Sequence, residues 1–199
     1  MFSNQKDVDN ILSALGEQLE GVLKKTIELL VCGGSALNAL GFIQRATKDV
    51  DVLAYVERNQ EGNIHFIKAS PLIPELKEAV RRVARDFNLP ENWFNAGPAS
   101  AVDFGLPEGL MERVTTRQYG QKLVVHFFGR FDQIHFKLYA AADQGAGKHY
   151  NDLLALNPTA EELEKAARWS LTHDVSEGYK QSIKGLLTHM GHGDVAKKL

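Results

Sequence analysis

"CGGSALNALGFIQRATKDVDVLAYV", residues 32–56, joins a Gly-Gly-Ser turn to a short apolar helix and then to an apolar strand that carries two aspartates. In a strand, residues i and i+2 project from the same face. Asp49 and Asp51 are therefore expected to present two carboxylates side by side, while Val50 and Val52 point into the core. Two adjacent carboxylates repel each other and are costly to bury unless a cation compensates them.

A divalent metal ion is the cation that suits this pair. Mg²⁺ prefers oxygen ligands, usually takes one or two carboxylates, and fills its other positions with water and substrate phosphates. The preceding turn supplies a phosphate cradle, because the backbone of Gly33 and Gly34 can approach an anion closely. Ser35 is expected as the N-cap of the following helix and Gly41 as its stop. The combination predicts metal-dependent transfer chemistry on a triphosphate.

The composition is that of an ordinary globular protein, with 199 residues, 44% apolar, 24% charged and a net charge of −2. This length allows one sizeable core or one core with a helical annex. The single cysteine, Cys32, excludes an internal disulfide and suits a reducing compartment. Neither a signal-peptide pattern nor an apolar run of about 20 residues is present. A cytoplasmic protein with no membrane partner is expected, and a P-loop phosphotransferase is excluded because its motif is missing.

The periodicity of apolar residues predicts the order of helices and strands. Helices are expected at residues 7–25, 35–41, 72–88, 132–144, 149–156, 159–172 and 176–190, and strands at 27–34, 48–56 and 122–129. Residues 89–120 are expected to be irregular, with a short helix or turn near 106–113. The pattern indicates an α/β fold with a small mixed sheet in residues 1–131 and a helical C-terminal part in residues 132–199.

Residues 34–52 resemble the signature of the nucleotidyltransferase superfamily, which has the DNA polymerase beta-like fold: a Gly-Ser, a spacer, then Asp-hydrophobic-Asp. A second segment, "FDQIHFKLYAAADQGAGKHYNDLLAL" (131–156), resembles the part of AbiEii-like and related nucleotidyltransferases that carries a lysine on one helix and an aspartate on the next. In this match Lys137 takes the lysine position, Lys148 the following basic position and Asp152 the final aspartate. "WFNAG" (93–97) is similar to a Trp-hydrophobic-Asn segment of the same families.

The resemblance implies an enzyme that moves a nucleoside monophosphate from an NTP to an acceptor hydroxyl on RNA or protein, with Mg²⁺ or Mn²⁺ as cofactor. Some relatives are toxins of toxin–antitoxin systems, so an antitoxin protein is an expected partner. The implied roles are metal binding by Asp49 and Asp51, catalysis by these two with Lys137 and Asp152, and nucleotide binding by Gly33, Gly34, Ser35, Lys137 and Lys148.

The sequence departs from the family pattern at two places. His149 stands where the relatives often have an aspartate, and the strand at 122–129 offers His126 but no acid. Asp152 is therefore expected as the third carboxylate, while Asp132 is expected as an N-cap of the helix that carries Lys137. The alternative is a catalytically degenerate nucleotide-binding or interaction module on the same fold. Arg45, beside the aspartates, suits either a phosphate or RNA contact or a solvated loop.

Overall fold

The computed structural model describes all residues 1–199, and the chain divides into two compact units. The first, here called the sheet unit, comprises Met1–Leu106 and Val114–Phe128. The second, the helical unit, comprises Pro107–Arg113 and Gly129–Leu199. The expected α/β fold is confirmed, since a mixed sheet of six strands is flanked by helices and the C-terminal region is helical.

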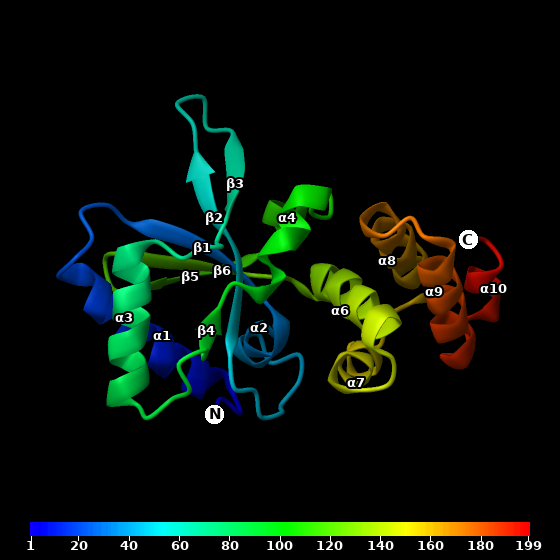
Figure 1. The fold of residues 1–199 in the computed structure, drawn as a ribbon, viewed down its shortest axis with the longest axis horizontal. Helices are drawn as coiled ribbons and strands as arrows, with labels where there is room; N and C mark the ends of the chain where they lie inside the picture. The colour runs from blue at the N-terminus through cyan, green and yellow to red at the C-terminus, as the bar shows by residue number, and fades with distance from the viewer. The chain divides into compact units, whose positions relative to one another are not determined.

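The sheet unit contains all the strands, and Figure 1 labels its strands β1–β6 and its helices α1–α4. Its elements in chain order are α1 (Gln5–Glu20), β1 (Ile27–Cys32), α2 (Gly33–Ala39), β2 (Val50–Arg58), β3 (Ile64–Lys68), α3 (Pro74–Asp86), β4 (Phe94–Asn95), the 3-10 helix η1 (Gly97–Ser100), α4 (Ala101–Phe104), β5 (Thr115–Tyr119) and β6 (Leu123–Phe127).

The strands are ordered β3-β2-β1-β6-β5, and the short β4 also pairs with β2. β1 runs antiparallel to β2 and parallel to β6, while β4 runs parallel to β2. Because β1 lies in the middle of the sheet, its residues from Leu29 to Val31 are fully buried. The end of β1 and the start of β2 therefore lie side by side at one edge of the buried core.

The core of the sheet unit forms where α1 and α3 pack against the sheet. Both helices carry an apolar stripe at helical spacing, and α1 begins where the Asn4 side chain accepts a hydrogen bond from the Asp7 backbone. Trp93 is fully buried in this core, where its indole N–H donates to the Val80 carbonyl at 3.0 Å. This bond satisfies the single polar group of the indole and fixes the chain just before β4.

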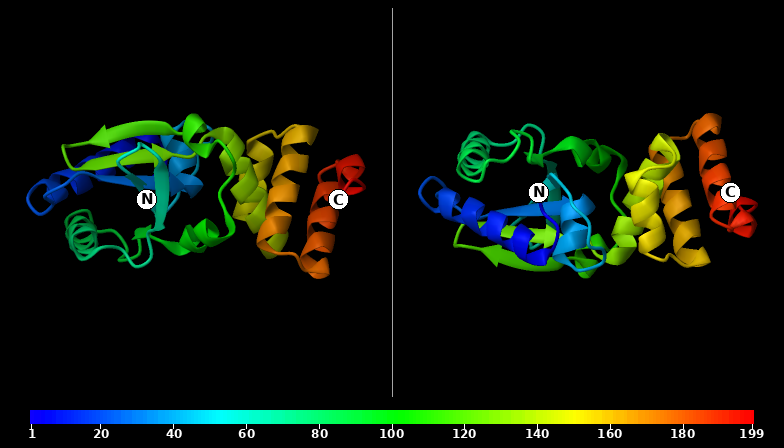
Figure 2. Two further views of the ribbon diagram at one scale, coloured as in Figure 1. Left: turned by 90° about the horizontal axis from the view of Figure 1, so that it is seen from above. Right: turned by 90° about the horizontal axis from the view of Figure 1, so that it is seen from below.

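The helical unit contains six helices, of which the first, α5, belongs to its short first segment. They are α5 (Leu110–Arg113), α6 (Arg130–Gln144), α7 (Lys148–Ala155), α8 (Ala160–His173), α9 (Glu177–His189) and α10 (Gly193–Ala196). α6 packs against α7, α8 and α9, and Figure 2 shows α8 and α9 side by side. Thr159 and Glu162 have the Thr-x-x-Glu spacing that predicts a capping box, and both hydrogen bonds of this box form at the start of α8.

Two expected N-caps are wrong. α6 begins after Gly129, and Asp132 lies inside its first turn, fully buried. There its carboxylate accepts two hydrogen bonds from the Arg113 guanidinium, at 2.6 and 3.0 Å, an arrangement that fixes both groups. Ser35 is not a cap either, because α2 begins at Gly33 after Cys32 and encloses it.

The strand predictions missed β3, β4 and β5 and placed the start of β2 two residues early. β3 and β5 are the two edge strands of the sheet, and most of their side chains are exposed or half-buried. Edge strands need no continuous apolar pattern, so the sequence signal is weak there. Since β2 begins at Val50, Asp49 lies one residue before the strand instead of within it.

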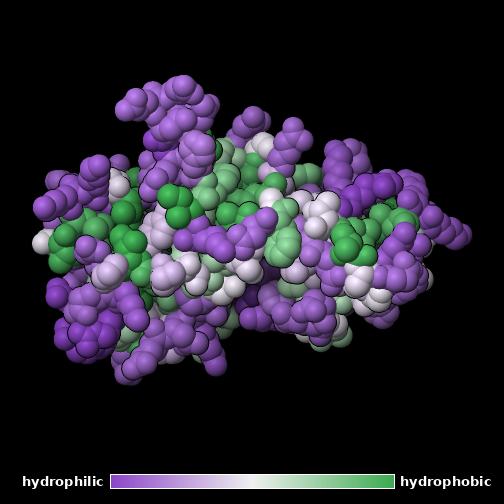
Figure 3. Space-filling view, turned by 45° about the horizontal axis from the view of Figure 1, so that its top comes forward, coloured by the Kyte–Doolittle hydropathy of each residue, from purple (hydrophilic) through white to green (hydrophobic).

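The surface mixes polar and apolar residues. Hydrophobic residues lie among hydrophilic ones on the face drawn in Figure 3. The large apolar side chains that are exposed come from separate segments of the chain: Met1, Val22, Ile67, Phe87, Phe104, Leu154 and Val175. None of the helices combines the length and the apolar character needed to cross a bilayer.

Candidate functional site

The start of α2 meets the start of β2 because β1 and β2 are antiparallel. Cys32, the last residue of β1, pairs with Asp51 in β2, so the Gly33–Gly34 turn that follows lies beside the aspartates. The expected alternation holds on the core side, where Val50 and Val52 are fully buried. Asp49 and Asp51 are half-buried. The Asp51 carboxylate lies against Gly33, and Asp49 accepts a hydrogen bond from Thr47, which lies against Gly34.

Gly33 is required by both its conformation and its neighbour. Its φ is +77°, a region that L side chains rarely adopt. A Cβ atom at this position would clash with the Asp51 carboxylate. The glycine therefore lets the carboxylate of Asp51 pack directly on the backbone of the turn.

Gly33→Ala should lower the free energy of unfolding by about 1–3 kcal/mol and displace the Asp51 side chain, because a strained φ and a clash act together. Urea denaturation measures the first effect. Gly41→Ala is the matched control, since Gly41 has a similar φ of +70° but no neighbour near a Cβ atom. An equal loss in both variants would show that the clash with Asp51 contributes nothing.

The loop that leads into β2 packs closely against Gly34. A Cβ atom on Gly34 would lie 2.9 Å from Thr47 Oγ1 and 3.2 Å from Arg45 Nη2. Thr47 Oγ1 donates a hydrogen bond of 3.1 Å to Asp49 Oδ1. The Arg45 guanidinium therefore lies at Gly34, one residue along the turn from the glycine that the Asp51 carboxylate contacts. A positive charge at this place is expected to offset part of the negative charge of the aspartates.

The loop that carries Arg45 and Thr47 is tied down at several points. The Asn38 side chain donates to the Arg45 carbonyl at 2.8 Å and to the Phe2 carbonyl at 3.1 Å. Phe2 and Thr47 also exchange two backbone hydrogen bonds of 2.8 and 2.9 Å. Because the loop is anchored to α2 and to the N-terminal segment, the Asp49 side chain is presented from a fixed backbone.

Thr47 and Asn95 were not expected as site residues, although Asn95 lies in the segment 93–97 that resembles the nucleotidyltransferase families. Asn95 Nδ2 donates a hydrogen bond of 3.2 Å to Asp51 Oδ1. The signal for Thr47 is local, since it lies two residues before Asp49. Asn95 is 44 residues away in sequence, and only the pairing of β4 with β2 brings it to Asp51.

Ser35 lies next to this turn with an unusual side chain. The residue is fully buried, and its hydroxyl has no hydrogen-bond partner. Buried hydroxyls are nearly always bonded, so an unpartnered one is a candidate for binding a ligand oxygen. This observation agrees with the expected role of Ser35 beside a phosphate, a role that stays a prediction.

The helical unit brings together two of the predicted residues. Lys137 on α6 and Asp152 on α7 form an ion pair of 2.8 Å, with only 4% and 1% of their side chains exposed. The glycine-rich turn between α6 and α7 lets the second helix pack against the first, as expected. Lys148, the first residue of α7, is exposed.

A second buried polar side chain lies on the same face of α6. Gln133 is four residues before Lys137, so the two lie one turn apart. Gln133 is fully buried, and neither its amide nitrogen nor its amide oxygen has a hydrogen-bond partner. The buried ion pair thus lies one turn from an amide group without hydrogen-bond partners. Buried polar atoms without partners are uncommon where a helix serves packing alone.

The predicted site residues fall into two groups in different compact units. Gly33, Gly34, Ser35, Asp49 and Asp51 belong to the sheet unit. The other group belongs to the helical unit: Lys137, Lys148 and Asp152. The expectation that both groups serve one site stays a prediction.

The donor set at Asp49 and Asp51 fits Mg²⁺ or Mn²⁺. It offers carboxylate oxygens only, which are the ligands that these ions prefer. No group of three His, Cys, Asp or Glu side chains that could hold a metal ion is found in the structure. An ion bound at the pair would therefore take its other ligands from water and substrate phosphates, as Mg²⁺ commonly does.

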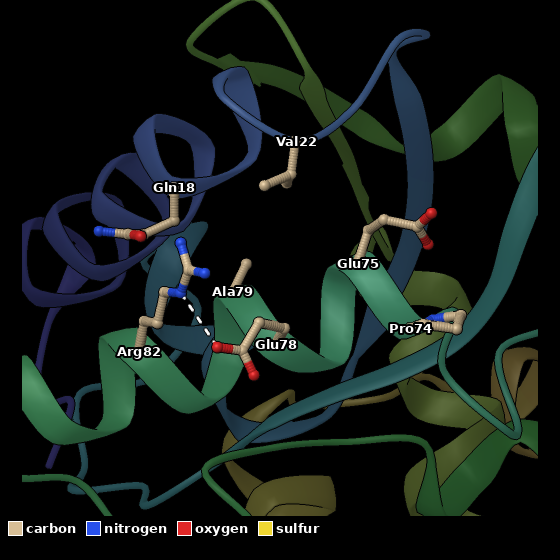
Figure 4. A pocket seen from close by; sticks show the side chains of 7 residues that line it. All are labelled: Gln18, Val22, Pro74, Glu75, Glu78, Ala79 and Arg82. Atoms are coloured by element: carbon tan, nitrogen blue, oxygen red, sulfur yellow. Dashed lines mark hydrogen bonds and ion pairs between the residues drawn. The ribbon is translucent and has the colours of Figure 1, made fainter.

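A surface pocket of about 290 Å³ lies elsewhere on the sheet unit. Figure 4 shows the side chains that line it, which come from α1, the residues just after it, and α3: Gln18, Val22, Pro74, Glu75, Glu78, Ala79 and Arg82. Arg82 is engaged by Glu78 through a bond of 3.1 Å. None of the predicted site residues lines this pocket, and its walls carry no pair of carboxylates beside a glycine turn.

Comparisons of the chain with protein-family models, with curated proteins and with solved structures found no match.

Proposed function

We propose that the chain is a metal-dependent nucleotidyltransferase that moves a nucleoside monophosphate from an NTP to an acceptor hydroxyl on RNA or protein. The observation that carries this proposal is the packing of the Asp51 carboxylate on Gly33, with Asp49 linked to the same turn through Thr47, which lies against Gly34. The resemblance to AbiEii-like nucleotidyltransferases supports the same reaction, and with it a role as the toxin of a toxin–antitoxin pair.

In this mechanism Asp49 and Asp51 would hold the metal ion. When bound, Mg²⁺ or Mn²⁺ neutralises triphosphate charge and polarises the phosphorus–oxygen bond that breaks. The Gly34 backbone and the unpartnered Ser35 hydroxyl would bind phosphate oxygens by hydrogen bonds. By the resemblance, Lys137 would offset the negative charge of the departing pyrophosphate, with Lys148 as a further basic contact.

Transfer of label from an NTP tests the proposal. The full chain is incubated with each α-labelled NTP, with Mg²⁺ or Mn²⁺, and with total RNA or a protein lysate. Label on RNA or on a protein is expected with at least one nucleotide, and it should depend on the metal. The absence of transfer with every nucleotide and acceptor would contradict the proposed activity.

A second candidate is a nucleotide-binding module that has lost turnover. It is favoured by the engagement of Asp152, the expected third carboxylate, in a buried ion pair with Lys137. It is also favoured by the lack of a three-ligand metal cluster. Calorimetric titration with an NTP and Mg²⁺ separates the two, because this module would bind the nucleotide while giving no label transfer.

A further inference from the structure

We propose that Asn95 is a positioning residue for the metal site, which it serves by fixing the orientation of the Asp51 carboxylate. This inference rests on the proposed function, since it assigns Asn95 a task only if Asp51 binds a metal ion. Asn95 would touch neither metal nor substrate, and it would act through one oxygen of Asp51.

The placement of Asn95 follows from backbone pairing. β4 pairs in parallel with the start of β2, so that Phe94 is opposite Val50 and Asn95 opposite Asp51. The Val50 N–H donates to the Trp93 carbonyl at 2.6 Å, which fixes the register. Side chains at paired positions of neighbouring strands project from the same face, so the Asn95 amide lies beside the Asp51 carboxylate.

The direction of the Asn95 amide is set by two hydrogen bonds of opposite sense. Its oxygen accepts from the Gly97 backbone N–H at 2.8 Å, and its nitrogen donates to Asp51 Oδ1 at 3.2 Å. Because the oxygen is engaged by an N–H group, the NH₂ end must point to the carboxylate. The amide is therefore a neutral donor locked between the loop after β4 and the acid of β2.

The anchoring of β4 makes this donor rigid. Trp93 is fully buried, bonded to the Val80 carbonyl, and in edge contact with the rings of Phe2 and Phe94. A donor on such an anchor holds one carboxylate oxygen in place and restricts rotation of the Asp51 side chain. Restricting a ligand in this way favours metal binding, because less conformational freedom is lost when the ion binds.

The test measures Mn²⁺ affinity by electron paramagnetic resonance on the full chain. Asn95→Leu keeps a similar side-chain size but removes the donor, and we expect binding about tenfold weaker than in the wild type. Asn63→Leu, in the turn between β2 and β3, is the matched control and should bind as the wild type does. A merely structural role of Asn95 would change the urea midpoint but leave the Mn²⁺ affinity of the folded protein unchanged.

A conservative variant gives a second readout that does not depend on Asn95→Leu folding well. Asn95→Gln keeps an amide that can donate to Asp51, and its Mn²⁺ affinity should therefore stay close to that of the wild type. A folded Asn95→Gln that binds Mn²⁺ as weakly as the donor-free variant, or wild-type affinity in Asn95→Leu, would overturn the role of Asn95 alone. A wild-type chain that binds no Mn²⁺ would overturn the proposed function and this inference together.

Discussion

Asp51→Asn should abolish Mg²⁺-dependent nucleotide binding and reduce label transfer by a factor of about 100 or more, because a metal ligand is lost. The substitution keeps the size of the side chain, and its amide oxygen can still accept the hydrogen bond from Asn95. The change therefore removes charge with little change in shape. Calorimetry with an NTP and Mg²⁺, together with the transfer assay, measures the loss.

The same variant should remain folded, with a free energy of unfolding equal to that of the wild type or slightly higher. Removing one of two carboxylates in the same segment should relieve their repulsion, and the Arg45 guanidinium at Gly34 should keep this gain small. Asp103→Asn is the control, because that carboxylate is exposed in the same unit and pairs only on the surface with Lys68. Loss of several kcal/mol in Asp51→Asn with normal nucleotide binding would show that the pair is structural.

The local part of the site could be predicted from sequence because it depends on short-range rules. Alternation in β2 buries Val50 and Val52 and leaves Asp51 half-buried beside the glycine turn. Amphipathic spacing likewise predicted the long helices, and the capping-box spacing predicted the start of α8. In each case the structure is decided by interactions between residues that are close in sequence, so the local sequence pattern is enough to predict it.

The rest depends on contacts between distant segments. The donor to Asp51 comes from Asn95 through the pairing of β4 with β2, and residues 93–97 read as a loop. The sequence suggests Asp132 as an N-cap, but in the structure its carboxylate accepts hydrogen bonds from Arg113, which lies 19 residues earlier. Asp152, the expected third carboxylate, forms an ion pair with Lys137 in the structure. The resemblance placed both residues in one site but did not predict a direct ion pair between them.

The ion pair between Lys137 and Asp152 leads to the largest expected effect on stability. Both side chains are almost fully buried, and the Nζ–Oδ2 distance is 2.8 Å. Removing one partner of such a pair leaves the other charge uncompensated in a poorly solvated place. Lys137→Met should therefore lower the free energy of unfolding by about 3–5 kcal/mol. Urea denaturation measures it.

Replacing both charges separates the cost of an unpaired ion from the value of the pair. Lys137→Met/Asp152→Leu removes both ions, and it should recover most of the stability lost in Lys137→Met, because apolar pairs of similar volume often replace buried ion pairs without loss. The matched control is Glu161→Leu/Lys165→Met, since that pair has the same 2.8 Å separation but is exposed. Removing it should change stability by less than about 1 kcal/mol.

The stable double variant then tests whether the buried pair serves a substrate. If Lys137 acts on the triphosphate, the folded double variant should bind an NTP much more weakly than the wild type but bind the nucleoside monophosphate equally well, because the lost charge acts on the β and γ phosphates. The unsatisfied Gln133 one turn away favours a ligand role over simple packing. An equal loss of affinity for both nucleotides, or no loss, would show that the ion pair only stabilises the fold of the helical unit. Nucleotide binding would then depend on the aspartates and the glycine turn of the sheet unit.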